Sequence, residues 1–251
     1  MDTTHGGRYV GSYGRETANS WVSDIDMIFE MPWSVYNQYD SYLGNGQSAL
    51  LQAVKNSIAI TFSNTYLAGD GQIVKVKFSD NMYFEVLPAF KNNDDSYTFA
   101  NSNNGGSWKK TNPIPEISAI KSGDKLTNNN LKRLCRMARS WKFYCRVPMP
   151  GLLIDTLAYR FLTNWDYKDK SFLYYDWMSR DYFYYLNEQD KNQNFWYAVG
   201  SNQLIICLGN FVNKAGIAYS KSLDAIKYES EDKPWSAKQK WREIYGLRFP
   251  E

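Results

Sequence analysis

The sequence predicts an α+β protein in which a mixed half, with strands and helices, precedes a mainly helical half. Three observations carry this prediction. Stretches with strand composition lie before residue 91, a segment rich in Asn, Asp, Ser and Gly runs from Lys91 to Asn112, and the apolar segments after it have helical spacing. We therefore expect two domains, residues 1–120 and 121–251.

The composition is typical of a folded chain without a membrane segment. Of its 251 residues, 43% are hydrophobic and 17% are aromatic. No stretch reaches the ~18 apolar residues that cross a bilayer, and the polar first ten residues lack the apolar core of a secretory signal. We expect a cytoplasmic protein, and the net charge of +3 is too small to argue for a polyanionic partner.

In chain order, the first half alternates predicted strands with one helix. Residues 24–31 have strand composition, and residues 47–58 place apolar side chains at helical spacing. Residues 74–78 and 82–90 form a predicted hairpin with its turn at 79–81. The polar segment 91–112 predicts a long surface loop.

The second half contains a series of predicted helices, at residues 131–141, 152–162, 179–189, 212–229 and 237–245. On the first of them, Lys132, Arg136 and Arg139 are spaced to share one face, which in most helices is simply solvated. Asp155 lies in an almost wholly apolar helix and is interpreted as a structural, hydrogen-bonded acid.

Residue counts limit the chemistry that the chain can perform. Its three cysteines, Cys135, Cys145 and Cys207, are widely spaced without a CxxC pair, which argues against a disulfide framework or a four-thiolate zinc site. His5 is the only histidine, which argues against Ser-His-Asp and Cys-His catalysis. The groups that could catalyse a reaction are therefore carboxylates, hydroxyls, lysine, or metal ions bound by oxygen ligands.

Two acids in the first predicted strand point to a metal site. In a strand, Asp24 and Asp26 project from the same face, whereas Ile25 and Met27 point to the other. Carboxylates this close repel each other unless a cation lies between them. Mg²⁺ suits the position because it prefers hard oxygen ligands and bridges carboxylates to substrate phosphates.

The turn before this strand, GSYGR, has the features of a phosphate-binding loop. Gly11 and Gly14 allow the backbone to approach a ligand closely, Ser12 offers a hydroxyl, and the helix expected after the turn has free N–H groups. Arg15 could either contact phosphate or lie at the solvated end of a helix. Together, turn and acids suit a nucleoside triphosphate with its metals.

The combination of GSYGR with SDIDM resembles the signature of DNA polymerase β-type nucleotidyltransferases. NMYFEVLPAF resembles the strand that carries the third metal-binding acid in oligoadenylate synthetases, often an aspartate, which implies that role for Glu85. Later segments resemble, in the same order, the bacterial cGAS/DncV-like nucleotidyltransferases (CD-NTases): GGSWKKTNPIPEISAI, LKRLCRMARSWK, GLLIDTLAY, FWYAVGSNQ and KWREIYGLRFP. Members of that family usually carry a long helix before the GS motif, where this sequence has ten residues.

The resemblance implies a polymerase β-type catalytic core with a mixed sheet, followed by a helical lobe like that of oligoadenylate synthetases. It implies two Mg²⁺ ions, with Mn²⁺ as an alternative, held by Asp24, Asp26 and Glu85. The nucleotide-binding residues that it implies are Gly11, Ser12, Arg139, Lys142 and Ser201.

The activity implied is synthesis of a cyclic di- or oligonucleotide, or a short linear oligonucleotide, as a second messenger in anti-phage defence. The substrates would be NTPs or dNTPs, an effector protein would sense the product, and neither a membrane nor duplex nucleic acid would be required. Two alternatives remain open: a template-free polymerase that makes RNA or DNA oligomers on the same core, and a catalytically silent nucleotide-binding sensor.

Overall fold

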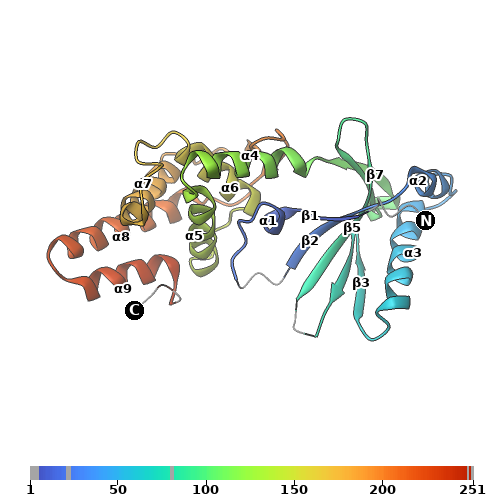
Figure 1. Ribbon diagram of the computed structural model, residues 1–251, viewed down its shortest axis with the longest axis horizontal. Coiled ribbons are helices and arrows are strands. Elements are labelled where there is room, and N and C mark those ends of the chain that lie inside the picture. Colours follow the sequence, from blue (N-terminus) through green and yellow to red (C-terminus); the bar gives the residue numbers. More distant parts are fainter. Residues whose placement is uncertain (1–5, 21–23, 80–81, 248, 250–251) are drawn as a thin grey trace. The chain divides into compact units, whose positions relative to one another are not determined.

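The computed structural model describes residues 6–20, 24–79, 82–247 and 249 and separates the chain into two units (Figure 1). The sheet unit comprises the chain up to Glu16 and Ser20–Ile117, and the helical unit comprises Thr17–Asn19 and Ser118–Glu251. His5, Ser23 and the Asp80–Asn81 turn, which entered the sequence interpretation, lie outside the described residues.

Within the described residues, seven strands of the sheet unit form one sheet of order β1-β2-β5-β4-β3, with β6 on β5 and β7 on β6. Only β2 and β5 run parallel among these pairs. The strands are β1 (Gly7–Tyr9), β2 (Asp24–Glu30), β3 (Tyr66–Asp70), β4 (Ile73–Lys77), β5 (Tyr83–Lys91), β6 (Tyr97–Asn101) and β7 (Ser107–Thr111).

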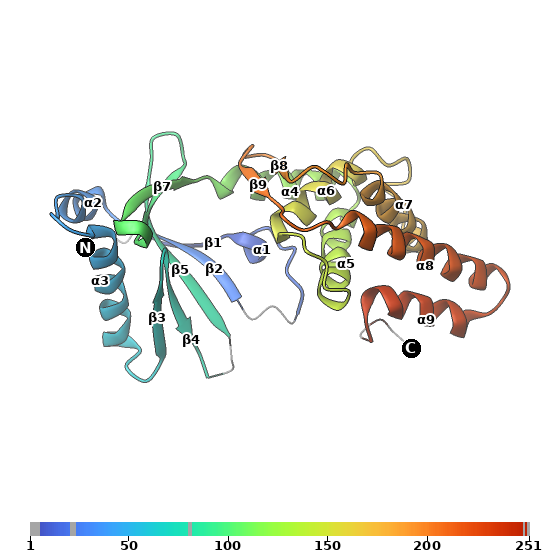
Figure 2. The ribbon, with the colours of Figure 1, turned by 180° about the vertical axis from the view of Figure 1, so that it is seen from behind.

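Helix α3 (Gly46–Thr61), preceded by α2 (Trp33–Asp40), covers one face of this sheet (Figures 1 and 2). Leu50 and Val54 of α3 pack against Val74 and Val86 in the larger core of this unit. A smaller core contains Val10, Ile28, Ala89, Tyr97 and Phe99. The sequence prediction of a helix at 47–58 is confirmed, because its apolar stripe is the face that this sheet buries.

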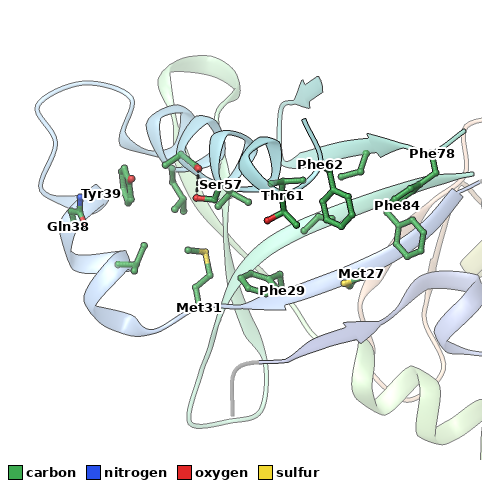
Figure 3. A pocket seen from close by; sticks show the side chains of 17 residues that line it. Met27, Phe29, Met31, Gln38, Tyr39, Ser57, Thr61, Phe62, Phe78 and Phe84 are labelled. Atoms are coloured by element: carbon green, nitrogen blue, oxygen red, sulfur yellow. Dashed lines mark hydrogen bonds between the residues drawn. The ribbon is translucent and has the colours of Figure 1, made fainter. Parts of the chain in front are cut away.

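An apolar groove of about 620 Å³ lies beside α3, on the sheet face that carries Met27 and Phe84 (Figure 3). Its few polar members include Gln38 and Ser57, and the Ser57 hydroxyl donates to the Ala53 carbonyl at 3.0 Å. Because side chains alternate along a strand, Asp26 and Glu85, the neighbours of Met27 and Phe84, project from the opposite face.

The surface loop predicted for residues 91–112 is wrong. This segment forms the hairpin β6–β7, and all of Tyr97–Asn101 is buried. Polar residues that are typical of loops pair with one another here: the Asn101 Nδ2 donates to Ser107 Oγ at 2.9 Å, and the Thr98 hydroxyl donates to Asn92 Oδ1 at 3.0 Å. Because these polar side chains have partners, their burial in the sheet is tolerated.

The helical unit contains α5 (Asn130–Tyr144), α6 (Gly151–Leu162), α7 (Tyr175–Asn187), α8 (Val212–Ser230), α9 (Pro234–Tyr245) and a small hairpin of β8 (Phe195–Tyr197) and β9 (Leu204–Ile206). Helix α4 (Pro113–Leu126) begins in the sheet unit and ends in the helical one. Helices α8 and α9 pack side by side (Figures 1 and 2). A continuous core joins α5, α6 and α7, with the rings of Trp141 and Phe183 5.1 Å apart.

The α+β class and the helices predicted for the second half are confirmed. Cys135 and Cys207 are buried, Cys145 is partly buried, and all three are free thiols, as the wide spacing predicted. None of the helices that the structure describes has the length and hydropathy of a membrane span.

Candidate active site

The three acids singled out from the sequence meet on neighbouring strands. Asp24 and Asp26 alternate along β2 with Ile25, which is 6% exposed. In the parallel register of β2 with β5, Asp26 lies beside Glu85 and Asp24 lies beside Tyr83. Paired residues of adjacent strands share a face, so Asp24, Asp26 and Glu85 project from the same side of the sheet.

The carboxyl group of Glu85 has a perturbed pKa. Burial raises its pKa, the Lys75 ammonium opposes that rise, and the negative charges of Asp26 and Asp24 add to it. Lys75 lies directly opposite Glu85 on β4, with its Nζ 3.6 Å from Glu85 Oε1 and 2.6 Å from Asp70 Oδ2. Lys75 therefore offsets part of the effect that burial and the two aspartates have on the pKa of Glu85.

The chemistry of these donors fits a divalent cation. Carboxylate oxygens are the ligands that Mg²⁺ prefers, and a cation between Asp26 and Glu85 removes the repulsion that raises the pKa of Glu85. Over the described part of the chain, no three Asp, Glu, Cys or His side chains are already arranged to hold a metal ion. The acids share a face, and binding would require their side chains to converge.

The GS turn packs directly against Asp26. It forms one helical turn, α1 (Gly11–Gly14), in which the Gly14 N–H donates to the Val10 carbonyl at 2.8 Å. Gly11 has φ +58°, and a Cβ at this position would overlap the Asp26 carboxylate. Glycine is therefore required at position 11 for two reasons: its φ is positive, and a side chain would clash with Asp26. The structure brings the turn and the acids of β2 together, as the sequence interpretation expected.

Arg15, which follows the turn, is neither solvated nor on the surface. Its side chain is 6% exposed, and its Nη1 lies 3.2 Å from Oε2 of Glu116 in the first turn of α4. The interpretation of Arg15 as a solvated helix end is wrong, because its charge is compensated by a carboxylate with a side chain only 4% exposed. A buried ion pair of this kind fixes the geometry of the chain around it.

Arg139 of α5 is held by several oxygens at once. Its Nη2 donates to Asp155 Oδ2 at 2.7 Å, to the Gly151 carbonyl at 3.1 Å and to Thr17 Oγ1 at 3.3 Å. Asp155 is fully buried, so its interpretation as a structural, hydrogen-bonded acid is confirmed. Of the basic stripe on α5, Lys132 also forms an ion pair, with Asp124 at 3.4 Å.

Lys142 and Ser201 lie in the helical unit with Arg139. The charge of Lys142 acts on the Cys207 thiol, where it lowers a pKa that burial raises. Ser201 lies in the turn between β8 and β9, where its Oγ accepts from the Gln203 N–H at 3.2 Å. The remaining nucleotide-binding and metal-binding candidates, Gly11, Ser12, Asp24, Asp26 and Glu85, belong to the sheet unit.

Two features of the site were missed in the sequence. Lys75 was predictable, since the alternating strand VKVK and a turn centred on residue 80 place Lys75 opposite Glu85. The hydrogen bond from Thr17 to Asp155 had no sequence signal, because it joins residues far apart in the chain.

Comparisons with known proteins show what this chain is similar to in sequence family and in fold. Residues 2–123 match the Second Messenger Oligonucleotide or Dinucleotide Synthetase (SMODS) domain. No curated protein matches the chain. Solved structures that match the chain are 12–15% identical to it in sequence, and at this identity they show the fold of the chain alone.

Among them is CdnC of E. coli MS115-1 with ATP, at TM-score 0.73 and 14% identity over 98% of this chain and 84% of that chain. The complex of CdnC with HORMA-deltaN matches at TM-score 0.71 and 13% identity over 100% and 85%. Vibrio cholerae DncV, a cyclic AMP-GMP synthase in complex with the linear intermediate 5′-pppA(3′,5′)pG, matches at TM-score 0.77 and 14% identity over 98% and 69%.

Proposed function

We propose that this chain, a nucleotidyltransferase of the cGAS/DncV-like class whose residues 2–123 match the SMODS domain, joins nucleotides into a cyclic di- or oligonucleotide, or a short linear oligonucleotide, that serves as a second messenger. The observation that carries the proposal is the register of β2 with β5. It sets Glu85 beside Asp26, with the GS turn packed against the same aspartate.

Asp24, Asp26 and Glu85 are the residues that would hold Mg²⁺, or Mn²⁺ in its place. When bound, the metal neutralises charge on the substrate phosphates and favours loss of a proton from the attacking hydroxyl. Glu85 would favour loss of that proton through the metal ion that it helps to hold.

The GS turn would hold the triphosphate. Gly11 brings the backbone within reach of a ligand beside Asp26, and the hydroxyl of Ser12 and the first N–H groups of the turn are donors of the kind that phosphate oxygens accept. Positioning of the substrate α-phosphate against the second nucleotide is the main contribution that such a turn makes.

Arg139, Lys142 and Ser201 would supply the remaining nucleotide contacts from the helical unit. Arg139 carries several donors on a planar guanidinium, of which Nη2 is engaged by Asp155, Gly151 and Thr17. Its preorganisation lowers the entropic cost of binding an anion. Lys142 adds a second positive charge on the last turn of the same helix.

The biological role that we propose is anti-phage defence in the cytoplasm, in which an effector protein senses the product. Support comes from the kinds of protein that share the fold. DncV is described as a cyclic AMP-GMP synthase, and CdnC has been solved both with ATP and in complex with HORMA-deltaN.

The test is to incubate the full chain with labelled NTPs and dNTPs and with Mg²⁺ or Mn²⁺, and to identify the products by mass spectrometry. We expect pyrophosphate release and a cyclic or short linear product, both abolished by EDTA and by the double variant Asp24→Asn/Asp26→Asn. Products of many nucleotides would favour the template-free polymerase. Nucleotide binding without pyrophosphate release under every combination would favour the silent sensor.

A further inference from the structure

We infer that Thr17 and Asp155 are positioning residues for the GS turn, and the catalytic part of this inference rests on the proposed function. The chain leaves the sheet unit after Glu16, belongs to the helical unit over Thr17–Asn19, and returns to the sheet unit at Ser20. The short segment 17–19 thus packs within the helical unit, whereas the turn that it follows belongs to the sheet unit.

The anchor of this segment is a buried polar network. Thr17 is 0% exposed, and its hydroxyl donates to Asp155 Oδ2 at 2.9 Å. The same oxygen accepts from Arg139 Nη2 at 2.7 Å, and Asp155 is itself 0% exposed. One carboxylate on α6 therefore holds both the segment that follows α1 and the guanidinium of α5. Buried charge-assisted bonds of this kind are short and strong.

The surroundings are built to accommodate the network. A Cβ on Gly151 would lie 2.7 Å from Arg139 Nη1, so a larger first residue of α6 would displace the guanidinium from its present position against Asp155. At the end of the segment, the Asn19 Nδ2 donates to Ser140 Oγ of α5 at 3.4 Å. The segment is therefore tied to the helical unit at both of its ends.

The residues on the other side of Glu16 are fixed as well. Arg15 is held by Glu116 at 3.2 Å, and Glu16 between the two anchors has φ +57°. Left-handed backbone is unfavourable for a glutamate and persists where its surroundings impose it. The ion pair and the Thr17 hydroxyl therefore set the conformation of the chain that leaves the GS turn.

The GS turn depends on these anchors because it is short. Helix α1 contains four residues, and a helix of that length is not stable by itself. Its backbone bonds run from Gly14 N–H to the Val10 carbonyl, from Arg15 N–H to the Gly11 carbonyl and from Glu16 N–H to the Tyr13 carbonyl. If Thr17 is released, these bonds open more often and the phosphate-binding atoms of Ser12 lose their fixed position.

The experiment compares Thr17→Val, which removes the hydroxyl at nearly constant volume, with Thr17→Ser, which keeps it. The matched control is Thr163→Val, because the Thr163 hydroxyl donates to the Tyr159 carbonyl at 2.7 Å at the end of the same helix α6. Amide hydrogen exchange of residues 14–16 is measured in the full chain together with kcat and KM for NTP. Asp155→Asn weakens the same bond from the acceptor side and serves if Thr17→Val does not fold; because it also affects Arg139, only its hydrogen exchange at residues 14–16 is compared, and exchange as slow as in wild type would overturn the anchor.

In Thr17→Val we expect about tenfold faster exchange at residues 14–16, as the loss of one hydrogen bond predicts, and a kcat about tenfold lower with a smaller change in KM. Thr17→Ser and Thr163→Val should stay within about twofold of wild type. Unchanged exchange in a folded Thr17→Val would overturn the anchor, and faster exchange with wild-type kcat would overturn the catalytic role. If the wild-type chain itself releases no pyrophosphate, the proposed function fails, while hydrogen exchange still decides the anchor.

Discussion

At Asp24 and Asp26, replacing a carboxylate by an amide removes a charged ligand of the proposed metal site and conserves the shape of the side chain. Asp24 is exposed and Asp26 is half-buried, so neither substitution opens a cavity. We expect Asp24→Asn and Asp26→Asn each to lower the rate of pyrophosphate release at least ~10³-fold, since metal-assisted transfer depends on these charges. The melting temperature should change by no more than ~2 °C.

The control for these two variants is Asp95→Asn. Asp95 also lies in the sheet unit, has a side chain that is 73% exposed, and forms an ion pair with Lys91 across a turn. Its pyrophosphate release should equal that of wild type. A fully active Asp24→Asn/Asp26→Asn double variant would show that the metal site lies elsewhere.

Arg139 should affect both nucleotide binding and stability. Arg139→Ala leaves the buried Asp155 carboxylate without its guanidinium, and removal of one partner of a buried pair costs about 3–5 kcal/mol. Among variants that remain folded at the measuring temperature, we expect nucleotide affinity to fall about tenfold, because charge-assisted contacts to phosphate are strong. Urea unfolding and nucleotide titration measure the two effects separately.

A second variant separates structure from binding at this position. Arg139→Ala combined with Asp155→Ala removes both charges, so the free energy of unfolding should fall by less than the sum of the two single losses. If nucleotide affinity of the folded single variant equals that of wild type, Arg139 serves only to hold Asp155 and Thr17.

At the scale of elements, the loop of the β6–β7 hairpin fixes the start of α3. The Asn45 side chain caps α3 by accepting from the Ser48 N–H at 2.8 Å, and its Nδ2 donates to the Ser102 carbonyl at 2.8 Å. Gly106 has φ +100°, and a Cβ there would lie 2.7 Å from Asn45 Oδ1. The neighbouring Gly105 has φ +87° and open space around it.

This difference gives a matched pair of substitutions. Gly106→Ala should lower the free energy of unfolding by about 2–3 kcal/mol, since backbone strain and overlap with the cap add. Gly105→Ala introduces backbone strain but no overlap with the cap, and it should lower the free energy of unfolding by about 1 kcal/mol. Urea unfolding measures both, and equal losses would show that the hairpin does not support the cap of α3.

The same hairpin marks the limit of what the sequence predicted about the fold. The helices α3, α5, α6, α8 and α9 were predictable because each has a long apolar stripe. Strand β6 was missed because it is buried on both faces and carries Thr98 and Asn101, whose polar groups are satisfied only by pairing with other residues. Strand β1, three residues long, lies in a polar segment without any strand pattern.

The candidate site also contains residues that the sequence predicted and residues that it did not. Asp24 and Asp26 follow from the two-residue period of a strand, and Glu85 follows from a resemblance that the register of β2 with β5 supports. The pairing of Thr17 with Asp155 was not predictable, because tertiary packing alone brings them together. A hydroxyl in a polar segment has no periodic pattern that distinguishes it from a solvated one.

At the scale of the whole molecule, the net charge bears on whether duplex nucleic acid activates the proposed synthesis. Binding a duplex through several phosphates requires a cluster of lysines and arginines, and this chain has a formal charge of only +3. Of the one basic stripe predicted on α5, Lys132 and Arg139 are engaged by Asp124 and Asp155. We expect product formation to proceed without nucleic acid. A strong rise in rate on adding long duplex DNA or RNA, lost at raised salt, would contradict this expectation.

The parallel pairing of β2 with β5 also determines when the candidate site forms during folding. The pairs β3–β4, β4–β5, β5–β6 and β6–β7 join neighbours in sequence, whereas Asp26 and Glu85 are about 60 residues apart, so their contact must await closure of a long loop. A chain in which only the sequential hairpins have formed would have Glu85 in place without its partners on β2. Metal binding at the proposed site should therefore appear late on refolding, after most of the secondary structure has formed.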